Sequence, residues 1–415
     1  MTKLIRRATM AALLSAASSL AVAALLPGNA AFAAAAKKDA KEPAAPTVRA
    51  AIGKSLNEAM KAVDAKDFAT ALTKVQDADK IADKTPFEEY QVAKYYGFIA
   101  INQPMPDYAA AAKAYNREVA SGGVPEAEKA TMYNVAMRLN YQEMNFPETI
   151  KDAAELQKMQ PLDDTGYLVL IQAYYNSNDF PNAAETAKKE IAAKVASGMK
   201  PTEDVLGLLL NAQIKSKNEA GAREALDQLA MVSAKPEVWG QEMDFVVGSQ
   251  GITDHQLLNA YRLSVLTGTM KDTDYAAMAT IDLQNGLPKE AVAVLTKANK
   301  SGELLTQANG LAARDDLEAL ATEAAKQTNG EVDVKLGESY YTYGQYDKAI
   351  AALEKGIQKG GLKDAADAQT TLGIAYLAAG QKDKAIAAFD QAAKTQTAAG
   401  QVAHAWSLYG HRVSA

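Results

Sequence analysis

A repeat of 34 to 36 residues constrains the fold of this chain more than any other feature of its sequence. It is clearest in the last hundred residues, where a set of glycine, alanine and large apolar residues returns after 36 positions. The set is Leu336, Gly337, Tyr340, Gly344, Ala349 and Leu353, and it returns as Leu372, Gly373, Tyr376, Gly380, Ala385 and Phe389. Upstream, Phe146 and Phe180 lie 34 residues apart, and each precedes a proline. A repeat of this length predicts stacked helix pairs, because one pair alone cannot bury its apolar face.

The small and large residues of the repeat have separate predicted places. Gly337 and Gly373 stand where a β-carbon would hold two helices apart, and Ala349 and Ala385 keep the second helix of each pair equally close. The larger residues fill the space between successive turns of the stack. No run of alternating β-branched residues predicts a strand. The pattern therefore indicates an all-α protein.

The series Leu-Gly-x-x-Tyr, followed by Gly, Ala and Phe, resembles the tetratricopeptide repeat. Most of residues 50–400 is similar to this family, and the best repeats span 130–163, 164–197, 330–362 and 366–400. The resemblance implies an α-solenoid of antiparallel helix pairs that forms a right-handed superhelix. It also implies a non-enzymatic scaffold for protein–protein interaction.

The sequence predicts five segments. They are a signal peptide at 1–33, a disordered leader at 34–49, an N-terminal repeat array at 50–235, an irregular helical junction at 236–271, and a C-terminal repeat array with a capping helix at 272–415. The junction contains Trp239 and His255 but no repeat motif. On the capping helix, Trp406 and Tyr409 are expected to cover the end of the last repeat. Residues 303–326 fit a short helix pair without the signature.

The beginning of the chain has the features of a secretory signal. Lys3, Arg6 and Arg7 precede an apolar run from 10 to 26, and residues 31–33 read Ala-Phe-Ala, a small-x-small cleavage site. These features predict export, most simply to a bacterial periplasm. A retained membrane anchor is the alternative, and it fits less well because the run is slightly short and carries three serines. No other segment is apolar enough to span a bilayer.

Few residues offer catalytic or metal chemistry. The chain has no cysteine, and its three histidines, His255, His404 and His411, are not spaced to share a metal from one helix turn. A phosphate-loop-like Gly53-Lys54-Ser55 lacks the first glycine of that motif, and the Ser-x-x-Lys pattern at 197–200 lies on a linker. The formal net charge is −6, which gives no support to nucleic-acid binding. We therefore predict no enzyme activity, cofactor or metal.

The resemblance also implies which residues bind a partner. In the family, ligand contacts come from positions 2, 5, 9, 12 and 13 of each repeat, which line a concave groove. The residues assigned in this way are Asn134, Arg138, Tyr141, Gln142, Gln172, Tyr175, Asn176, Asn211, Glu338 and Tyr341. Leu168 and Gly207 stand where a carboxylate clamp of the family would need basic residues, so that clamp is not reproduced.

Two kinds of partner fit this set. The first is a protein or peptide of the cell envelope, bound in the groove as an extended segment or a helix. The second is a glycan or small ligand, for which tyrosine rings and the amides of Gln142, Gln172 and Asn176 would serve as stacking faces and hydroxyl partners. Tyr141 and Tyr175 can either contact the partner or pack in the core, because their position adjoins a structural tyrosine, Tyr174.

Overall fold

The computed structural model describes residues 46–414, and every helix or strand assigned in this range is an α-helix. Most consecutive helices are joined by short loops and pack against one another, which confirms the predicted all-α solenoid of antiparallel pairs. The predicted signal peptide and most of the predicted leader fall within residues 1–45, outside the described range.

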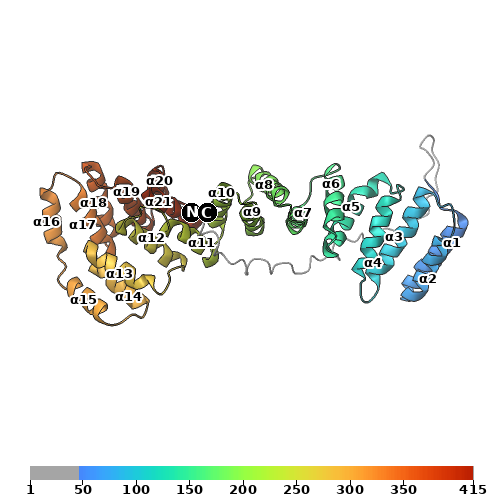
Figure 1. Cartoon of the computed structure of the whole chain (residues 1–415), viewed down its shortest axis with the longest axis horizontal. Coiled ribbons are helices and arrows are strands. Elements are labelled where there is room, and N and C mark those ends of the chain that lie inside the picture. The colour runs from blue at the N-terminus through green and yellow to red at the C-terminus, as the bar shows by residue number, and fades with distance from the viewer. Residues whose placement is uncertain (1–45, 415) are drawn as a thin grey trace. The chain divides into compact units, whose positions relative to one another are not determined.

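Helix packing divides the chain into two compact units, whose described parts are residues 46–222 and 223–414. The division falls within α10 (Glu219–Val232). The first unit contains α1 (Ala50–Asp64), α2 (Phe68–Asp79), α3 (Pro86–Asn102), α4 (Tyr108–Ala120), α5 (Glu126–Gln142), α6 (Phe146–Gln157), α7 (Asp164–Asn176), α8 (Phe180–Ala196) and α9 (Glu203–Lys215) (Figure 1).

The second unit contains the helices that follow α10. They are α11 (Pro236–Val247), α12 (Asp254–Thr267), α13 (Asp274–Asn285), α14 (Pro288–Lys297), α15 (Glu303–Ala312), α16 (Leu317–Lys326), α17 (Glu331–Thr342), α18 (Tyr346–Lys359), α19 (Ala365–Ala378), α20 (Lys382–Ala392) and α21 (Ala398–Ser414). Residues 236–271, predicted as an irregular junction, thus supply α11 and α12, and both pack within this unit.

The first unit is a linear succession of helix pairs. Each helix from α1 to α9 packs on its neighbour in the sequence, and the first helices α5, α7 and α9 also contact one another in turn. Asp67, Asp107 and Asp179 accept backbone N–H groups at the starts of α2, α4 and α8. These caps accept hydrogen bonds from amides that have no partner within the helix, and the negative charge of each aspartate is stabilised by the positive end of the helix dipole.

Close helix approach in the best repeats depends on glycine, as predicted. A β-carbon added to Gly337 would lie 2.6 Å from Cγ of Leu353, and one added to Gly373 would overlap the ring of Phe389. Ala349 and Ala385 are fully buried in the facing helices. The absent side chains therefore let α17 pack on α18, and α19 on α20, at short range.

The second unit closes on itself. Trp406 of α21 stacks on Phe389 with ring centroids 5.5 Å apart, which confirms the predicted cover for the last repeat. In addition, α21 contacts α11 and α12, and α12 contacts α19. The Trp406 indole N–H donates to the backbone carbonyl of Asn259 over 2.9 Å. The first and last helices of this unit are therefore in contact, which a linear array does not require.

The segment 303–326 forms two helices that do not pack as a pair. α15 packs on α13 and α14, whereas α16 packs on α17, and no extensive contact joins α15 to α16. A short linker, residues 313–316, connects them. This differs from the expected helix pair, because each helix covers its apolar side against a different neighbour.

Gly373→Ala tests the role of the close approach. The new methyl group would press on the Phe389 ring, so we expect the free energy of unfolding to fall by roughly 1–3 kcal/mol. Gly310→Ala, on α15, is the matched control, since nothing lies within 4 Å of the added carbon. It should stabilise the helix by about 0.5–1 kcal/mol. Urea unfolding measures both variants, and equal effects would contradict the packing account.

Candidate functional site

Seven of the predicted partner-binding residues lie on α5, α7 and α9 with their side chains exposed or half-buried. We call them the amide–tyrosine face: Asn134, Tyr141, Gln142, Gln172, Tyr175, Asn176 and Asn211. Successive first helices are in contact, and the Tyr141 hydroxyl donates to Oε1 of Gln172 over 2.5 Å. The face carries phenol and amide groups and no charged side chain.

Arg138 belongs to the predicted set but is turned into the structure. Its side chain is only 5% exposed, and its guanidinium bonds both carboxylate oxygens of Asp163 at 2.8 and 2.9 Å. Its Nε donates to Asn134 over 2.8 Å. Because Asp163 also caps α7, Arg138 fixes α5 to the start of the next first helix. Its charge is already paired, so it positions the face and adds no free charge to it.

The two tyrosines of the face also pack in the structure. Tyr141 lies against Phe146 with ring centroids 5.9 Å apart, and Tyr175 lies against Phe180 at 5.2 Å. Each phenylalanine is the first residue of the second helix in its repeat. Both tyrosines remain half-buried, so each ring combines a packing edge with a solvent edge.

A cluster of three polar side chains, Asn116, Asn140 and Asp152, lies next to the amide–tyrosine face. Asn140 of α5 exchanges two hydrogen bonds with Asn116 of α4, at 2.7 and 2.9 Å, and donates to Asp152 of α6 over 2.8 Å. Burial raises the pKa of Asp152 to about 6, against the opposing effect of the Asn140 hydrogen bond. The three side chains fix the register of α4, α5 and α6 next to Tyr141.

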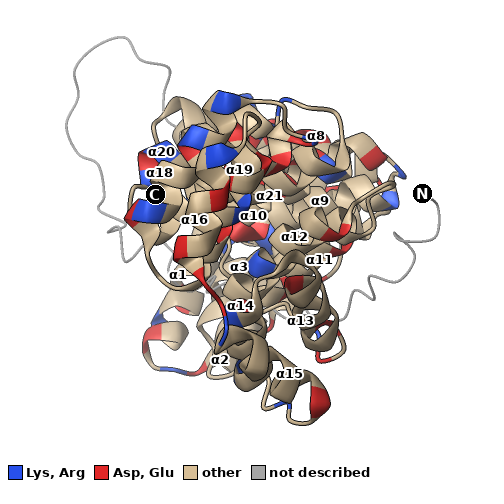
Figure 2. Ribbon diagram, turned by 90° about the vertical axis from the view of Figure 1, so that its left-hand side faces the viewer, with Lys and Arg blue, Asp and Glu red and all other residues tan. Residues whose placement is uncertain are grey.

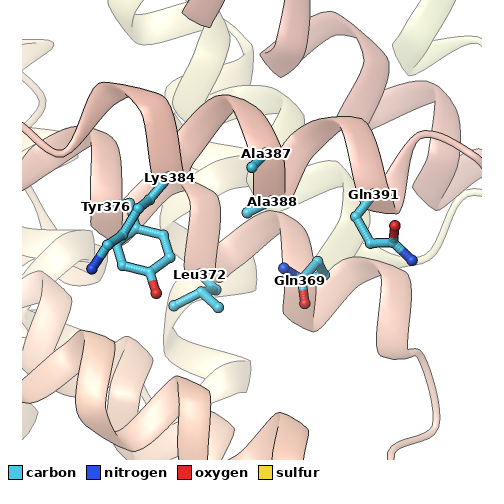
Figure 3. A pocket seen from close by; sticks show the side chains of 7 residues that line it. All are labelled: Gln369, Leu372, Tyr376, Lys384, Ala387, Ala388 and Gln391. Carbon is cyan, nitrogen blue, oxygen red and sulfur yellow. The ribbon is translucent and has the colours of Figure 1, made fainter.

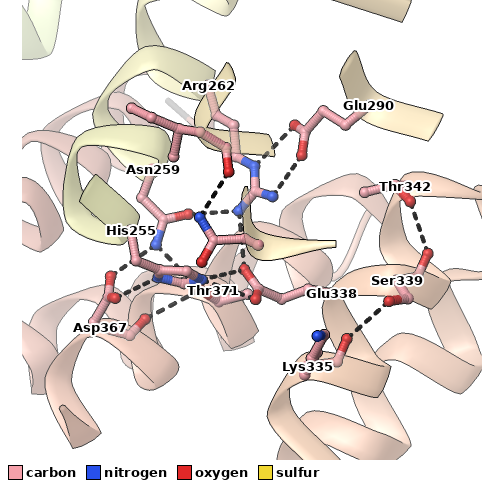
Figure 4. A network of polar contacts seen from close by, with 12 residues as sticks. His255, Asn259, Arg262, Glu290, Lys335, Glu338, Ser339, Thr342, Asp367 and Thr371 are labelled. Carbon is pink, nitrogen blue, oxygen red and sulfur yellow. Dashed lines mark hydrogen bonds and ion pairs between the residues drawn. The ribbon is translucent and has the colours of Figure 1, made fainter. Parts of the chain in front are cut away.

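Of the two predicted residues of the second unit, Glu338 is buried against α12 (Figure 4), whereas Tyr341 is half-buried. Glu338 is 4% exposed and faces both His255 and Arg262. The Arg262 guanidinium lies over the Tyr341 ring, 5.4 Å from its centroid. A partner could reach Glu338 only if α12 moved away.

Three residues on one side of α12 make this contact. His255 Nε2 is 2.8 Å from Glu338, and its Nδ1 is 2.5 Å from Asp367 of α19. Asn259 donates to Asp367 over 2.8 Å and to Thr371 over 3.1 Å. Arg262 binds Glu290 of α14 at 2.6 and 2.9 Å and Glu338 at 3.3 Å. The network therefore joins α12 and α14 to α17 and α19.

The opposite charges of this network stabilise one another. Burial disfavours the charged imidazole of His255, but the carboxylates of Glu338 and Asp367 outweigh it and raise its pKa well above the usual value. Burial likewise opposes the charge on Glu338, yet His255 and Arg262 prevail and lower its pKa to about 2. Asp282, close to Glu290, is fully buried, and burial raises its pKa to about 9.

Sequence reasoning missed this network because its partners come from four helices far apart in the chain. One signal was present: His255, Asn259 and Arg262 follow an i, i+4, i+7 spacing, which places three polar residues on one side of a helix. That stripe predicts a polar contact but does not identify the acidic residues that complete it.

A shallow hollow of about 350 Å³ lies over α19 and α20 (Figure 3). It is lined by Gln369, Leu372, Tyr376, Lys384, Ala387, Ala388 and Gln391. The Tyr376 hydroxyl already bonds Glu354, and Lys384 lies over its ring. One repeat earlier, Asp333 and Lys355 occupy the positions of Gln369 and Gln391 and form an ion pair of 3.0 Å. The hollow is open and gathers no group suited to catalysis.

The described residues give little support to metal binding or to a membrane-spanning helix. Between residues 46 and 414, no cluster of three or more His, Asp or Glu side chains is arranged to hold a metal ion. None of the helices in that range is long and apolar enough to cross a bilayer. Over α16 to α20, basic and acidic segments are interspersed (Figure 2). This surface is therefore of mixed charge.

Comparisons with known proteins find similarity in structure only. No family model and no curated protein matches the sequence. Among solved structures, the chain is similar to one in the structure of Naa15/Naa10 bound to HypK-THB (15% identity, TM-score 0.29, covering 82% of this chain and 58% of that one). It is also similar to the P58(IPK) TPR domain, with 15% identity and a TM-score of 0.21, covering 88% of this chain and 98% of that one. A third similar chain belongs to the APC/C hetero-tetramer Cut9–Hcn1, with 14% identity and a TM-score of 0.23, covering 83% of this chain and 66% of that one.

The chain thus spans less than two thirds of the length of the first and third of these similar chains. The superpositions are loose, and the helical-repeat fold is established by this chain's own helix pairs and by the glycines between them. The partners in the printed titles belong to those proteins.

Asp152→Asn tests the buried support of the face. The pKa of Asp152 is raised, so its contribution to stability is complete below its unfolded value of 3.8 and is lost as the pH rises through about 6. The amide variant, which keeps an acceptor for Asn140, should lack this loss between about pH 4 and pH 7. Glu155→Gln, on the same helix but exposed to solvent, is the control. Urea unfolding across this range should give different pH slopes for the wild type and the variant; equal slopes would contradict the assignment.

Proposed function

We propose that this protein is a non-enzymatic scaffold of the cell envelope that binds a protein or peptide partner on the amide–tyrosine face. The observation that carries the proposal is the contrast between the two units. Seven ligand positions on α5, α7 and α9 reach the surface, whereas Glu338 of α17 is buried against α12. Partner binding is therefore assigned to the first unit.

The chemistry of the face indicates how a partner is held. Asparagine and glutamine amides both donate and accept hydrogen bonds, as peptide groups do, and tyrosine adds a large, rigid contact surface. The nearby charges of Arg138 and Asp163 are already paired. Recognition should therefore rest on hydrogen bonds and aromatic contact, with a weak dependence on salt.

The proposed location rests on the N-terminal sequence alone. Residues 1–33 combine a basic start, an apolar run and the Ala31-Phe32-Ala33 site, which is typical of an exported precursor. The partner is accordingly expected in the envelope.

Gln142→Ala combined with Asn176→Ala tests the binding face. Both side chains are exposed, so the melting temperature should stay unchanged. Two lost hydrogen bonds of roughly 1 kcal/mol each should weaken binding by at least about tenfold. The probe is a fluorescein-labelled peptide, synthesised from the consensus of a random dodecapeptide phage library selected on the full chain. Fluorescence anisotropy gives its Kd.

The control is Gln307→Ala combined with Asn309→Ala, a pair of exposed amides on α15 that should leave the Kd unchanged. Equal affinity of the face variant and the wild type would remove this face from the function. The same proteins are tested on a glycan array. The glycan alternative would be favoured if the wild type binds a glycan on the array, the face variant does not, and the phage library yields no peptide.

Export predicts a defined mature terminus. The chain recovered from the envelope of an expressing bacterium should begin at Ala34, because cleavage follows the small-x-small site. N-terminal sequencing and intact mass measurement check this. Recovery of a chain that retains Met1, found only in the cytoplasm, would contradict the proposal.

A further inference from the structure

The second unit contains two groups of helices that meet along a polar seam. On one side, α12 packs on α13 and α14 through an apolar cluster: Leu258, Tyr261, Met278, Ile281, Leu287 and Val294. On the other side, α16, α17 and α18 share a cluster that includes Ala324, Leu336 and Ala352. Each group thus has its own apolar packing.

The contacts across the seam are of a different kind. Next to α17 and α19 they are the hydrogen bonds and ion pairs of His255, Asn259 and Arg262. Farther along, Lys289 of α14 lies over the Tyr343 ring at 5.8 Å, and the Tyr343 hydroxyl donates to Asp315 over 3.0 Å. Polar interfaces of this kind are typical of parts that move relative to one another.

The chain connection permits such a movement. The two groups are joined through residues 313–316, and α15 and α16 have no extensive contact that would stiffen this linker. At the other end of the lid, α12 packs on α11. Opening would also break the hydrogen bond from Trp406 of α21 to the Asn259 carbonyl, which lies between His255 and Arg262. The linker and the α11 contact would act as the pivots.

We propose that α12–α15 form a lid over Glu338 and Asp367, and that His255 and Arg262 are the latch that keeps it closed. The lid goes beyond the proposed function and does not depend on it. When it is open, it exposes the carboxylates of Glu338 on α17 and Asp367 on α19. The second unit thus holds a ligand face that the chain itself covers.

The titratable groups around the latch decide when it opens. Glu338 of α17 and Asp367 of α19 face His255, while Arg262 of the same helix faces Glu338 and Glu290. Asp282 of α13 adjoins Glu290. Since the pKa of His255 is raised, its contribution to closure is complete below the ordinary imidazole value and is lost as the pH rises through the raised one.

The absence of cysteine from the chain makes a direct distance measurement possible. Spin labels at Lys297→Cys on α14 and Ala351→Cys on α18, both exposed, span the seam. Double electron–electron resonance on the full chain should give one distance near neutral pH. As the pH rises through the His255 pKa measured by ¹⁵N NMR, a second, longer population should appear with its midpoint at that pKa.

Variants separate the latch from general instability. His255→Gln should show the longer population already at neutral pH, whereas His404→Gln, which removes a histidine paired with Asp227 elsewhere in the unit, should not. Labels at Ala351→Cys and Ala387→Cys lie on one side of the seam, on α18 and α20, and should keep a single distance throughout.

A single seam distance for the wild type both below and above the measured His255 pKa would overturn the lid. The lid would also be overturned if the distance between the labels on α18 and α20 changed together with the seam distance, because the whole unit would then be unfolding. The wild-type titration does not depend on whether the His255 variant folds. A midpoint that does not coincide with the His255 pKa would remove His255 as the latch.

Discussion

Every helix pair in this chain depends on an apolar face that only the next helix can cover. The closest approaches occur where Gly337 meets Leu353 and where Gly373 meets Phe389, and a single methyl group would disturb either contact. The first unit continues this succession from α1 to α9. The side chains of the amide–tyrosine face on α5, α7 and α9 remain exposed or half-buried, so they are available for recognition.

The second unit uses the same helix pairs but adds a different interaction. Its first and last helices, α11 and α21, are in contact, and buried ion pairs join α12 and α14 to α17 and α19. Losing one member of such a pair is strongly destabilising, because the other charge is then left buried without a partner. His255, Arg262, Glu338 and Asp367 therefore act as one group. The residues that would contact a ligand in a linear array serve here as partners for α12.

Much of the fold follows from the sequence, because the repeat fixes both the length of the helix pair and the places of its small residues. Gly337, Gly373 and the Trp406 cover over Phe389 are where the pattern predicts them. The closure of the second unit could not be predicted in this way. It depends on Asp367 and Glu338 lying 112 and 83 residues from His255, and local periodicity contains no information about such contacts.

The candidate site was predictable to a similar extent. The repeat register assigns Tyr141, Gln172 and Tyr175 to neighbouring helices, and the structure brings Tyr141 into contact with Gln172. The register could not distinguish an exposed ligand position from a covered one, so Glu338 was grouped with Gln142 although α12 buries it. The burial of such a residue depends on which helix, distant in the sequence, packs over it, and that is a property of the tertiary fold.

Native-state hydrogen exchange of the full chain tests the central claim most directly, which is that one unit is a linear array and the other is closed. In the second unit, the amides of α12, α17 and α19 should exchange through one common opening with one free energy. In the first unit, protection should decline helix by helix towards α1, as in a linear stack. Independent opening of α12 and α17, with the same gradual pattern in both units, would contradict the account.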